Sequence, residues 1–141
     1  MKYFLSTLGS PPSGLILGIP CEAAAFLRYL PGKPGGPVEE DEEEQRFSLP
    51  HFFGFSGEEI RHGIILKGGV KPRVLLLTAV EREEEFAAGE LHSPPPLLGA
   101  LGGFLTGLRF QALEAGDSLP LLLIDPFKLT EEILRRRTEL V

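Results

Sequence analysis

The sequence predicts an all-β fold, and three observations support this prediction. Four segments in the second half are short, apolar and rich in β-branched residues or Phe, with Gly or Pro near their ends: His62 to Lys67, Arg73 to Val80, Phe104 to Leu113 and Leu119 to Asp125. The chain of 141 residues contains 17 Gly and 13 Pro, which indicates many turns between short elements. The same half has almost no side chain suited to catalysis, a pattern typical of binding surfaces.

Length and charge limit the classes of function. A chain of 141 residues can bury about two thirds of its unfolded surface, so we expect one domain over residues 1–141. The net charge of −6 provides no basic surface for phosphates, which argues against nucleic-acid binding. Cys21 is the only cysteine, and no apolar run approaches the roughly 20 residues of a membrane span. We therefore expect a cytoplasmic protein without disulfides or membrane insertion.

The first third of the chain predicts a hairpin, a strand and a loop. Lys2 to Leu8 and Gly14 to Ile19 are apolar segments joined by a turn rich in Gly, Ser and Pro, so they should pair as a hairpin. Cys21 to Leu30 is interpreted as a short turn and then a strand. Residues 31–46 are rich in Gly and Pro and include six consecutive acids at 39–44, which predicts a mobile, solvated loop. The acids could alternatively dock on a basic partner.

The middle of the chain predicts further strands. Phe47 to Phe55 should form a strand end and a tight turn. Arg73 to Val80 is apolar on both faces, which makes it the best candidate for a central strand. Phe104 to Leu113 has one polar face and should be half-buried, and the acids between Glu81 and Glu85 are expected at the exposed end of a strand.

A single helix is expected at the C-terminus. Thr130 is the predicted N-cap, with acids in the first turn and the run Arg135 to Arg137 near the negative end of the helix dipole. The expected apolar side consists of Ile133, Leu134, Leu140 and Val141. No internal repeat is evident in the sequence.

In their order and spacing, three parts of the chain resemble the CheW-like adaptor domain of bacterial chemotaxis. The opening hairpin and the strand after it look like the first elements of that family. The segment RFSLPHFFGF is similar to the family's proline step before its second barrel, with matching residues at Leu49, Pro50, Phe53 and Gly54. The second half is similar to the family's hairpin, Pro-Pro-Leu corner, Thr-Gly strand and Asp-Pro end, with matching residues at Pro95, Leu97, Thr106, Gly107, Asp125, Pro126 and Leu129.

The resemblance implies a fold and a function. The fold would be one CheW-like domain of two small five-stranded β-barrels packed together, with a C-terminal α-helix. The function would be that of a non-catalytic adaptor, without a cofactor, that links chemoreceptors to the histidine kinase CheA. The family usually carries an Asn-Leu-Arg-Gly element before the proline step, and here the Gly/Pro segment and the acid run occupy that interval. A diverged CheW-like scaffold in a non-chemotactic pathway is therefore an alternative.

Seven residues are candidates for contacts with the kinase and the receptor signalling tip. Phe26, Leu27 and Tyr29 come from the predicted third strand, and Leu97 and Leu98 come from the Pro-rich corner. The remaining two are Phe52 and Phe53, because four Phe near a turn with Pro and Gly are difficult to bury together. These Phe could instead bridge two small cores.

No group of residues in the sequence suits catalysis or metal binding. His51, His62 and His92 are not spaced as zinc ligands. Cys21 has no neighbouring cation in the sequence that would favour its thiolate, so we interpret it as a packed thiol. The remaining alternative is a small-ligand-binding β-barrel whose Phe-rich strands would line a cavity.

Overall fold

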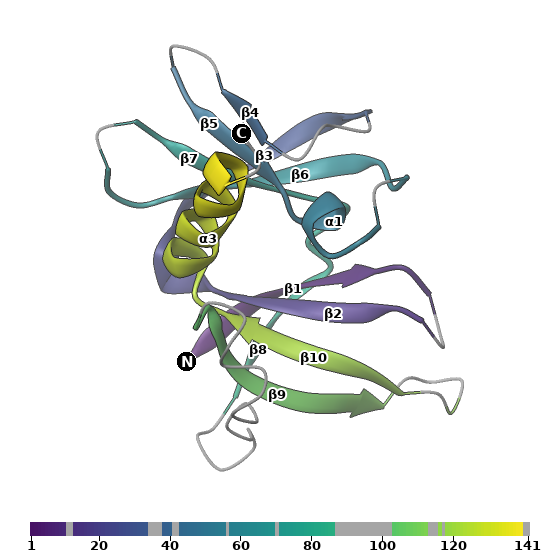
Figure 1. Ribbon diagram of the computed structural model, residues 1–141. Helices are drawn as coiled ribbons and strands as arrows, with labels where there is room; N and C mark the ends of the chain where they lie inside the picture. The colour runs from purple at the N-terminus through teal and green to yellow at the C-terminus, as the bar shows by residue number, and fades with distance from the viewer. Residues whose placement is uncertain are drawn as a thin grey trace.

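A computed structural model of the chain describes residues 1–10, 13–33, 38–40, 43–55, 57–69, 71–86, 103–112, 116 and 118–139. These residues form two five-stranded sheets, one stacked on the other, with a helix on either side of the space between them (Figure 1). The described part of the chain is mostly β-structure, as the sequence predicts.

Sheet A lies at the bottom of Figure 1 and is built from both ends of the chain. Its strand order is β8, β1, β2, β10, β9, with bounds Arg82–Glu85, Lys2–Leu8, Leu15–Pro20, Ser118–Ile124 and Leu105–Ala112. The strands β1 and β2 form the predicted antiparallel hairpin, in which Thr7 lies opposite Ile16. The strand β10 pairs with β2 in parallel, so the last strand lies against the N-terminal hairpin.

Sheet B lies above sheet A in the same view and comes from one continuous segment. Its strand order is β3, β6, β7, β5, β4, with bounds Ala24–Lys33, Ile60–Leu66, Arg73–Leu77, Gln45–Ser48 and Val38–Glu40. A 3-10 turn, η1 (Cys21–Ala23), connects β2 to β3, which confirms the predicted turn and strand. The strand β7 is the middle strand of the sheet and buries four of its five residues, so the prediction of a central strand is also confirmed.

The two sheets repeat one arrangement of strands, although the sequence shows no internal repeat. Along each sheet, successive neighbours pair antiparallel, antiparallel, parallel and antiparallel. In sheet B the strands β3, β4 and β5 precede the hairpin β6–β7, whereas in sheet A the hairpin β1–β2 precedes β8, β9 and β10. Sheet A is therefore a circular permutation of sheet B, and sheet B is inserted between its two parts.

A helix follows the equivalent strand of each sheet. The short helix α1 (Leu49–Phe52) follows β5, and α3 (Pro126–Glu139) follows β10. Each has a Pro in its first turn, where the missing N–H costs nothing. The hydroxyl of Ser48 accepts a hydrogen bond from the backbone of α1, and the carboxylate of Asp125 accepts two from the backbone of α3.

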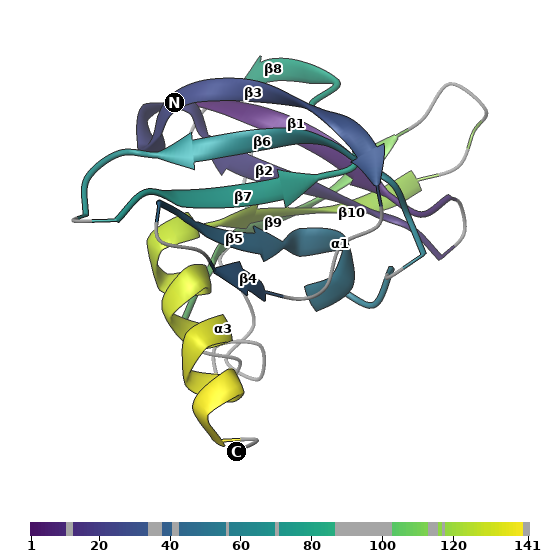
Figure 2. The same ribbon diagram turned by 90° about the horizontal axis from the view of Figure 1, so that it is seen from above.

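A shared hydrophobic core joins the sheets and both helices. Its buried members come from most of the strands, from η1, α1 and α3, and from the residue before β9: Phe4, Leu8, Leu17, Ile19, Ala23, Phe47, Leu49, Ile64, Leu66, Leu75, Leu77, Phe104, Ile124, Leu129 and Ile133. A smaller cluster buries the other face of sheet A, and a third buries the other face of sheet B. Figure 2 shows α3 extending away beside the stacked sheets toward the C-terminus.

The prediction of closed barrels is wrong, because neither sheet closes on itself. Closure would require backbone pairing between the two edge strands of a sheet. In the described ranges no ladder joins β3 to β4 or β8 to β9, and β4 and β8 contain only three and four residues. Sheet B has a side-chain link instead, since Nη1 of Arg28 in β3 donates at 3.0 Å to each carboxylate oxygen of Glu44, just before β5.

Three other expectations differ from the structure. Part of the predicted loop at 31–46 is strand, since β3 runs to Lys33 and both β4 and the start of β5 lie within it. The acids after Glu81 do not end a strand but form β8, a separate edge strand paired with β1. The helix α3 begins at Pro126, so Thr130 lies inside it. Its buried hydroxyl donates to the carbonyl of Phe127 and accepts from Arg73. The apolar side of the helix is confirmed at Ile133 and Leu134, while Leu140 and Val141 lie outside the described residues.

Two buried serines should respond oppositely to removal of their hydroxyls. Ser6 Oγ in β1 has no hydrogen-bond partner among the described atoms, whereas Ser48 Oγ caps α1. A buried hydroxyl without a partner is unfavourable, so Ser6→Ala should raise the free energy of unfolding by about 1 kcal/mol. Loss of a cap is destabilising, so Ser48→Ala should lower it by about 1 kcal/mol. Urea unfolding measures both values, and a loss of stability in Ser6→Ala would contradict the prediction.

The start of α3 can be tested at its cap. Asp125 Oδ1 accepts from the backbone N–H groups of Phe127 at 3.0 Å and Lys128 at 3.2 Å. Asp125→Ala should therefore lower the free energy of unfolding by about 1 kcal/mol and speed hydrogen exchange at those two amides. Asp125→Asn keeps an acceptor and serves as the matched control. Unchanged exchange at both amides in Asp125→Ala would mean that the helix is capped elsewhere.

Candidate interaction surfaces

The edge strand β3 exposes three large apolar side chains. Phe26, Leu27 and Tyr29 are 59%, 41% and 85% exposed, and together they are called the β3 surface. They occupy both faces of the strand, because Phe26 is paired with Ile65 while Leu27 is paired with the adjacent Ile64. Among the described strands, only β6 pairs with β3, so the side of β3 that faces away from β6 is an open edge of sheet B. The sequence predicted all three as contact residues, and the structure exposes all three on this edge strand.

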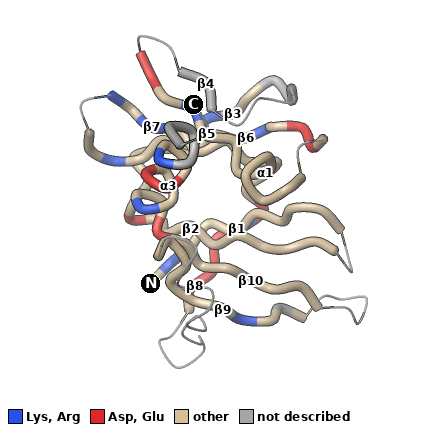
Figure 3. The backbone as a smooth tube through the Cα atoms, viewed as in Figure 1, with Lys and Arg blue, Asp and Glu red and all other residues tan. Residues whose placement is uncertain are grey.

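A second apolar surface lies on sheet A. A groove of about 300 Å³ runs between the end of α1 and the strands β9 and β10, with walls formed by Phe53, Gly103, Phe104, Leu105, Leu108, Pro120 and Leu122. Phe110 is 69% exposed, lies opposite Pro120 in the ladder, and shares the face of Leu108 two residues earlier. These residues and Phe110 are together called the β9–β10 groove. Figure 3 shows few charged residues along this part of sheet A, where the strands β1, β2, β9 and β10 carry only Lys2 and Arg109.

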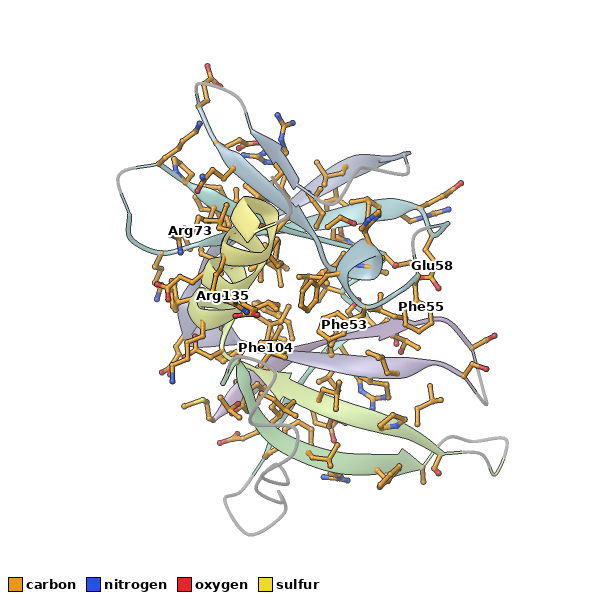
Figure 4. The ribbon with its side chains drawn as sticks, viewed as in Figure 1. Phe53, Phe55, Glu58, Arg73, Phe104 and Arg135 are labelled. Atoms are coloured by element: carbon orange, nitrogen blue, oxygen red, sulfur yellow. The ribbon has the colours of Figure 1, made fainter. Side chains whose placement is uncertain are left out.

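Three aromatic rings connect α1 to sheet A at the inner end of the groove. The rings of Phe52 and Phe53 meet edge to face with centroids 5.0 Å apart, and they lie 5.8 and 6.4 Å from the ring of Phe104. Phe104 is buried in the shared core, and the other two are half-buried against it. The alternative, a bridge between two small cores, differs from the structure in one respect: Phe52 and Phe53 pack against the one core that the two sheets share. Phe53 also lines the groove, as Figure 4 shows from its position beside Phe104.

The turn after α1 is held to sheet A by a carboxylate. Glu58 Oε1 accepts from the backbone N–H of Gly9 at 2.6 Å, and Oε2 accepts from the hydroxyl of Thr78 at 2.8 Å. Gly9 begins the turn between β1 and β2, and Thr78 directly follows β7 in sheet B. Phe55 packs on Gly9 so closely that a Cβ there would lie 2.5 Å from the ring atom Cε1. Figure 4 shows Phe55 and Glu58 side by side at this junction.

No family model matches the chain, and a comparison with curated proteins finds no match either. Among solved structures, the chain is similar to the crystal structure of the scaffolding protein TtCheW from Thermoanaerobacter tengcongensis. The TM-score is 0.54 over 89% of this chain and 85% of that one, at 14% sequence identity. The chain has a CheW-like fold. At this identity the likeness concerns the fold alone.

Two motifs of the CheW-like resemblance occupy equivalent places in the repeated arrangement. Leu49 and Pro50 begin α1 after β5, and Asp125 and Pro126 begin α3 after β10. Leu97 and Leu98, the remaining predicted contact residues, lie outside the described residues. Sequence reasoning missed Phe110 as a candidate contact. Its alternation with Arg109 and Gln111 was visible, but the groove walls come from three separate segments.

The CheW-like chain also has a wider and more polar depression of about 730 Å³. It lies where the end of β2, the start of β1 and the start of α3 meet, and its polar groups come from Tyr3, Glu22, Lys67, Thr106 and Asp125. Burial raises the pKa of Tyr3 above its ordinary value, and the nearby Glu22 carboxylate raises this pKa further. The phenol is therefore a neutral hydrogen-bonding group at physiological pH.

Among the described histidines, His62 contacts neighbouring backbone and side-chain groups. Nδ1 of His62 accepts from the backbone N–H of Val80 at 2.9 Å, and its ring lies 4.7 Å from that of Tyr29. His51 lies in α1, and His92 is outside the described residues. Within the described ranges, no three His, Cys, Asp or Glu side chains could together hold a metal ion. No helix among the described residues is both long and apolar enough to cross a membrane.

Cys21 should be an unreactive thiol. It is half-buried beside the shared core, and burial raises the pKa of its thiol, with the Glu83 carboxylate raising that pKa further. Because the thiolate is the reactive form, alkylation by iodoacetamide at pH 8 should be slower than that of free cysteine. The rate should keep rising with pH beyond the ordinary thiol pKa. A faster reaction than free cysteine near pH 7 would contradict this and indicate an activated nucleophile.

Proposed function

We propose that this chain is a non-catalytic adaptor that links the signalling tip of a chemoreceptor to a CheA-type histidine kinase. The observation that carries the proposal is the presence of two separate apolar surfaces, the β3 surface on sheet B and the β9–β10 groove on sheet A. An adaptor needs two contact surfaces that can be occupied at once. The cytoplasmic location expected from the sequence goes with this role.

Exposed aromatic side chains support the proposal on energetic grounds. Among the large hydrophobic side chains of the described residues, Tyr29 and Phe110 are the two most exposed. Each lies on an edge strand of its sheet. Contiguous apolar surface is uncommon on a protein that works alone, and it is typical of interaction sites. Aromatic residues often provide a large part of the binding free energy at such interfaces. The CheW-like fold and the scaffolding role stated for TtCheW agree with this function.

Each surface should bind a different partner. Tyr29→Ser should weaken binding of one of two probes, a CheA regulatory domain and a receptor signalling-tip fragment, by about tenfold or more, because an aromatic contact is lost. Phe110→Ser should weaken binding of the other probe by a similar factor. Both side chains are exposed, so the melting temperature should change little in either variant. Isothermal titration calorimetry measures both affinities.

Two outcomes would contradict this proposal. If the unmodified chain binds neither probe, the adaptor role is wrong while the fold stands. If both substitutions weaken the same probe and spare the other, the two surfaces form a single site. Met1 is exposed, lines the polar depression and belongs to neither apolar surface, so Met1→Gln is a control. A cleavable tag placed before this position keeps a start codon for translation.

A second candidate function is small-ligand binding, and the polar depression of about 730 Å³ favours it. This volume is within the range of small-molecule sites, and polar groups from five residues surround it. A rise in melting temperature with one member of a metabolite panel, in the absence of any protein partner, would favour this function over the adaptor role.

A further inference from the structure

We propose that Glu58 is a positioning residue that fixes one wall of the β9–β10 groove. It would act by holding the turn after α1 against the β1–β2 turn of sheet A. The inference rests on the proposed function, because it treats the groove as a partner site.

Both oxygens of the Glu58 carboxylate are used, and they bind to opposite sheets. Oε1 accepts from the backbone of Gly9 in the β1–β2 turn of sheet A, at 2.6 Å, and Oε2 accepts from Thr78 just after β7 of sheet B, at 2.8 Å. Hydrogen bonds to a charged acceptor are stronger than those between neutral groups. The side chain therefore connects the two sheets at the end of the hairpin, on the same side as α1.

The turn that carries Glu58 also carries one wall of the groove. Phe53, five residues earlier, packs on Phe104 and lines the groove, and Phe55 packs on Gly9. The turn is thus held at its start by ring contacts and at its end by the carboxylate. Figure 4 shows Phe53, Phe55 and Glu58 in sequence along the gap between the sheets. Release of Glu58 would remove the polar contact at the far end of the turn and leave Phe53 held by its ring contacts and by its backbone hydrogen bond to Leu49.

A fixed wall matters because a preformed groove binds without the cost of ordering its own side chains. The two hydrogen bonds of Glu58 go to Gly9 and Thr78 and not to β3, although the turn leads into β6, the strand that pairs with β3. Loss of the Glu58 contacts should therefore weaken binding of the partner that occupies the β9–β10 groove and leave binding of the other partner unchanged. A general loss of stability would weaken binding of both partners.

The chain provides a matched control beside Glu58. Glu59 is exposed and pairs with exposed Arg61 at 2.9 Å, so Glu59→Ala removes the same charge from the same turn without touching Gly9 or Thr78. Glu58→Gln keeps an amide oxygen that can accept from Gly9 and removes the charge. Thr78→Val removes one of the two hydrogen bonds and replaces Glu58→Ala if that variant does not fold.

The experiment has one arm without a partner and one with both probes. In the first, NMR measures hydrogen exchange at the Gly9 amide and the NOE between the rings of Phe53 and Phe104. Glu58→Ala should speed that exchange by about tenfold or more and weaken the NOE, while Glu59→Ala should match the unmodified chain. In the second arm, one probe is the one whose binding Phe110→Ser weakens. Glu58→Ala should lower the affinity for that probe by about tenfold and leave the affinity for the other probe unchanged. Glu58→Gln should restore much of the loss.

Two results would overturn the inference. In one, Glu58→Ala keeps both the slow Gly9 exchange and the Phe53–Phe104 NOE. In the other, Glu58→Ala weakens both probes to the same extent, which indicates a merely structural residue. If neither probe binds the unmodified chain, the proposed function fails, and the NMR arm still decides whether Glu58 holds Phe53 in place.

Discussion

A hydrophobic core shared by two open sheets holds this molecule together, because neither sheet covers its inner face by itself. Each sheet is followed at the equivalent strand by a helix, and each helix reaches toward the other sheet. The end of α1 places Phe52 and Phe53 on Phe104, just before β9, and Thr130 in α3 accepts a hydrogen bond from Arg73 in β7. The helix that follows one sheet thus packs on the other sheet, and these contacts, rather than closure of each sheet, join the two repeated units.

The exposed surfaces follow from this arrangement. Side chains that face the shared core are buried where the sheets overlap, and apolar residues beyond the overlap remain on the surface. The β9–β10 groove continues the core onto the surface in this way, since Phe104 belongs to the core while Leu108 and Leu122 are only partly buried. The β3 surface arises differently, from an edge strand with apolar side chains on both faces. The two apolar surfaces therefore lie on different sheets of one packed molecule.

Much of the fold could be predicted from local sequence, and the rest depends on contacts between distant segments. The hairpin, the central strand Arg73–Leu77 and the strand β3 follow from apolar patterns and turn signals. The short acidic strand β8 could not be found this way, because its residues are strand-forming only beside β1. The position of Asp125 ahead of a Pro signals a cap, yet Thr130 carries the stronger local pattern. Thr130 is instead buried inside the helix, where its hydroxyl accepts from Arg73. The groove joins Phe53 to β9 and β10, which no local pattern reveals.

The central claim is that two partners occupy the chain at the same time. Sedimentation velocity of the unmodified chain with a CheA regulatory domain and a receptor signalling-tip fragment tests it most directly. The account predicts one complex that contains all three components, with a sedimentation coefficient above that of either pair. Displacement of one probe by the other, or sedimentation of the chain alone in the presence of both, would contradict it.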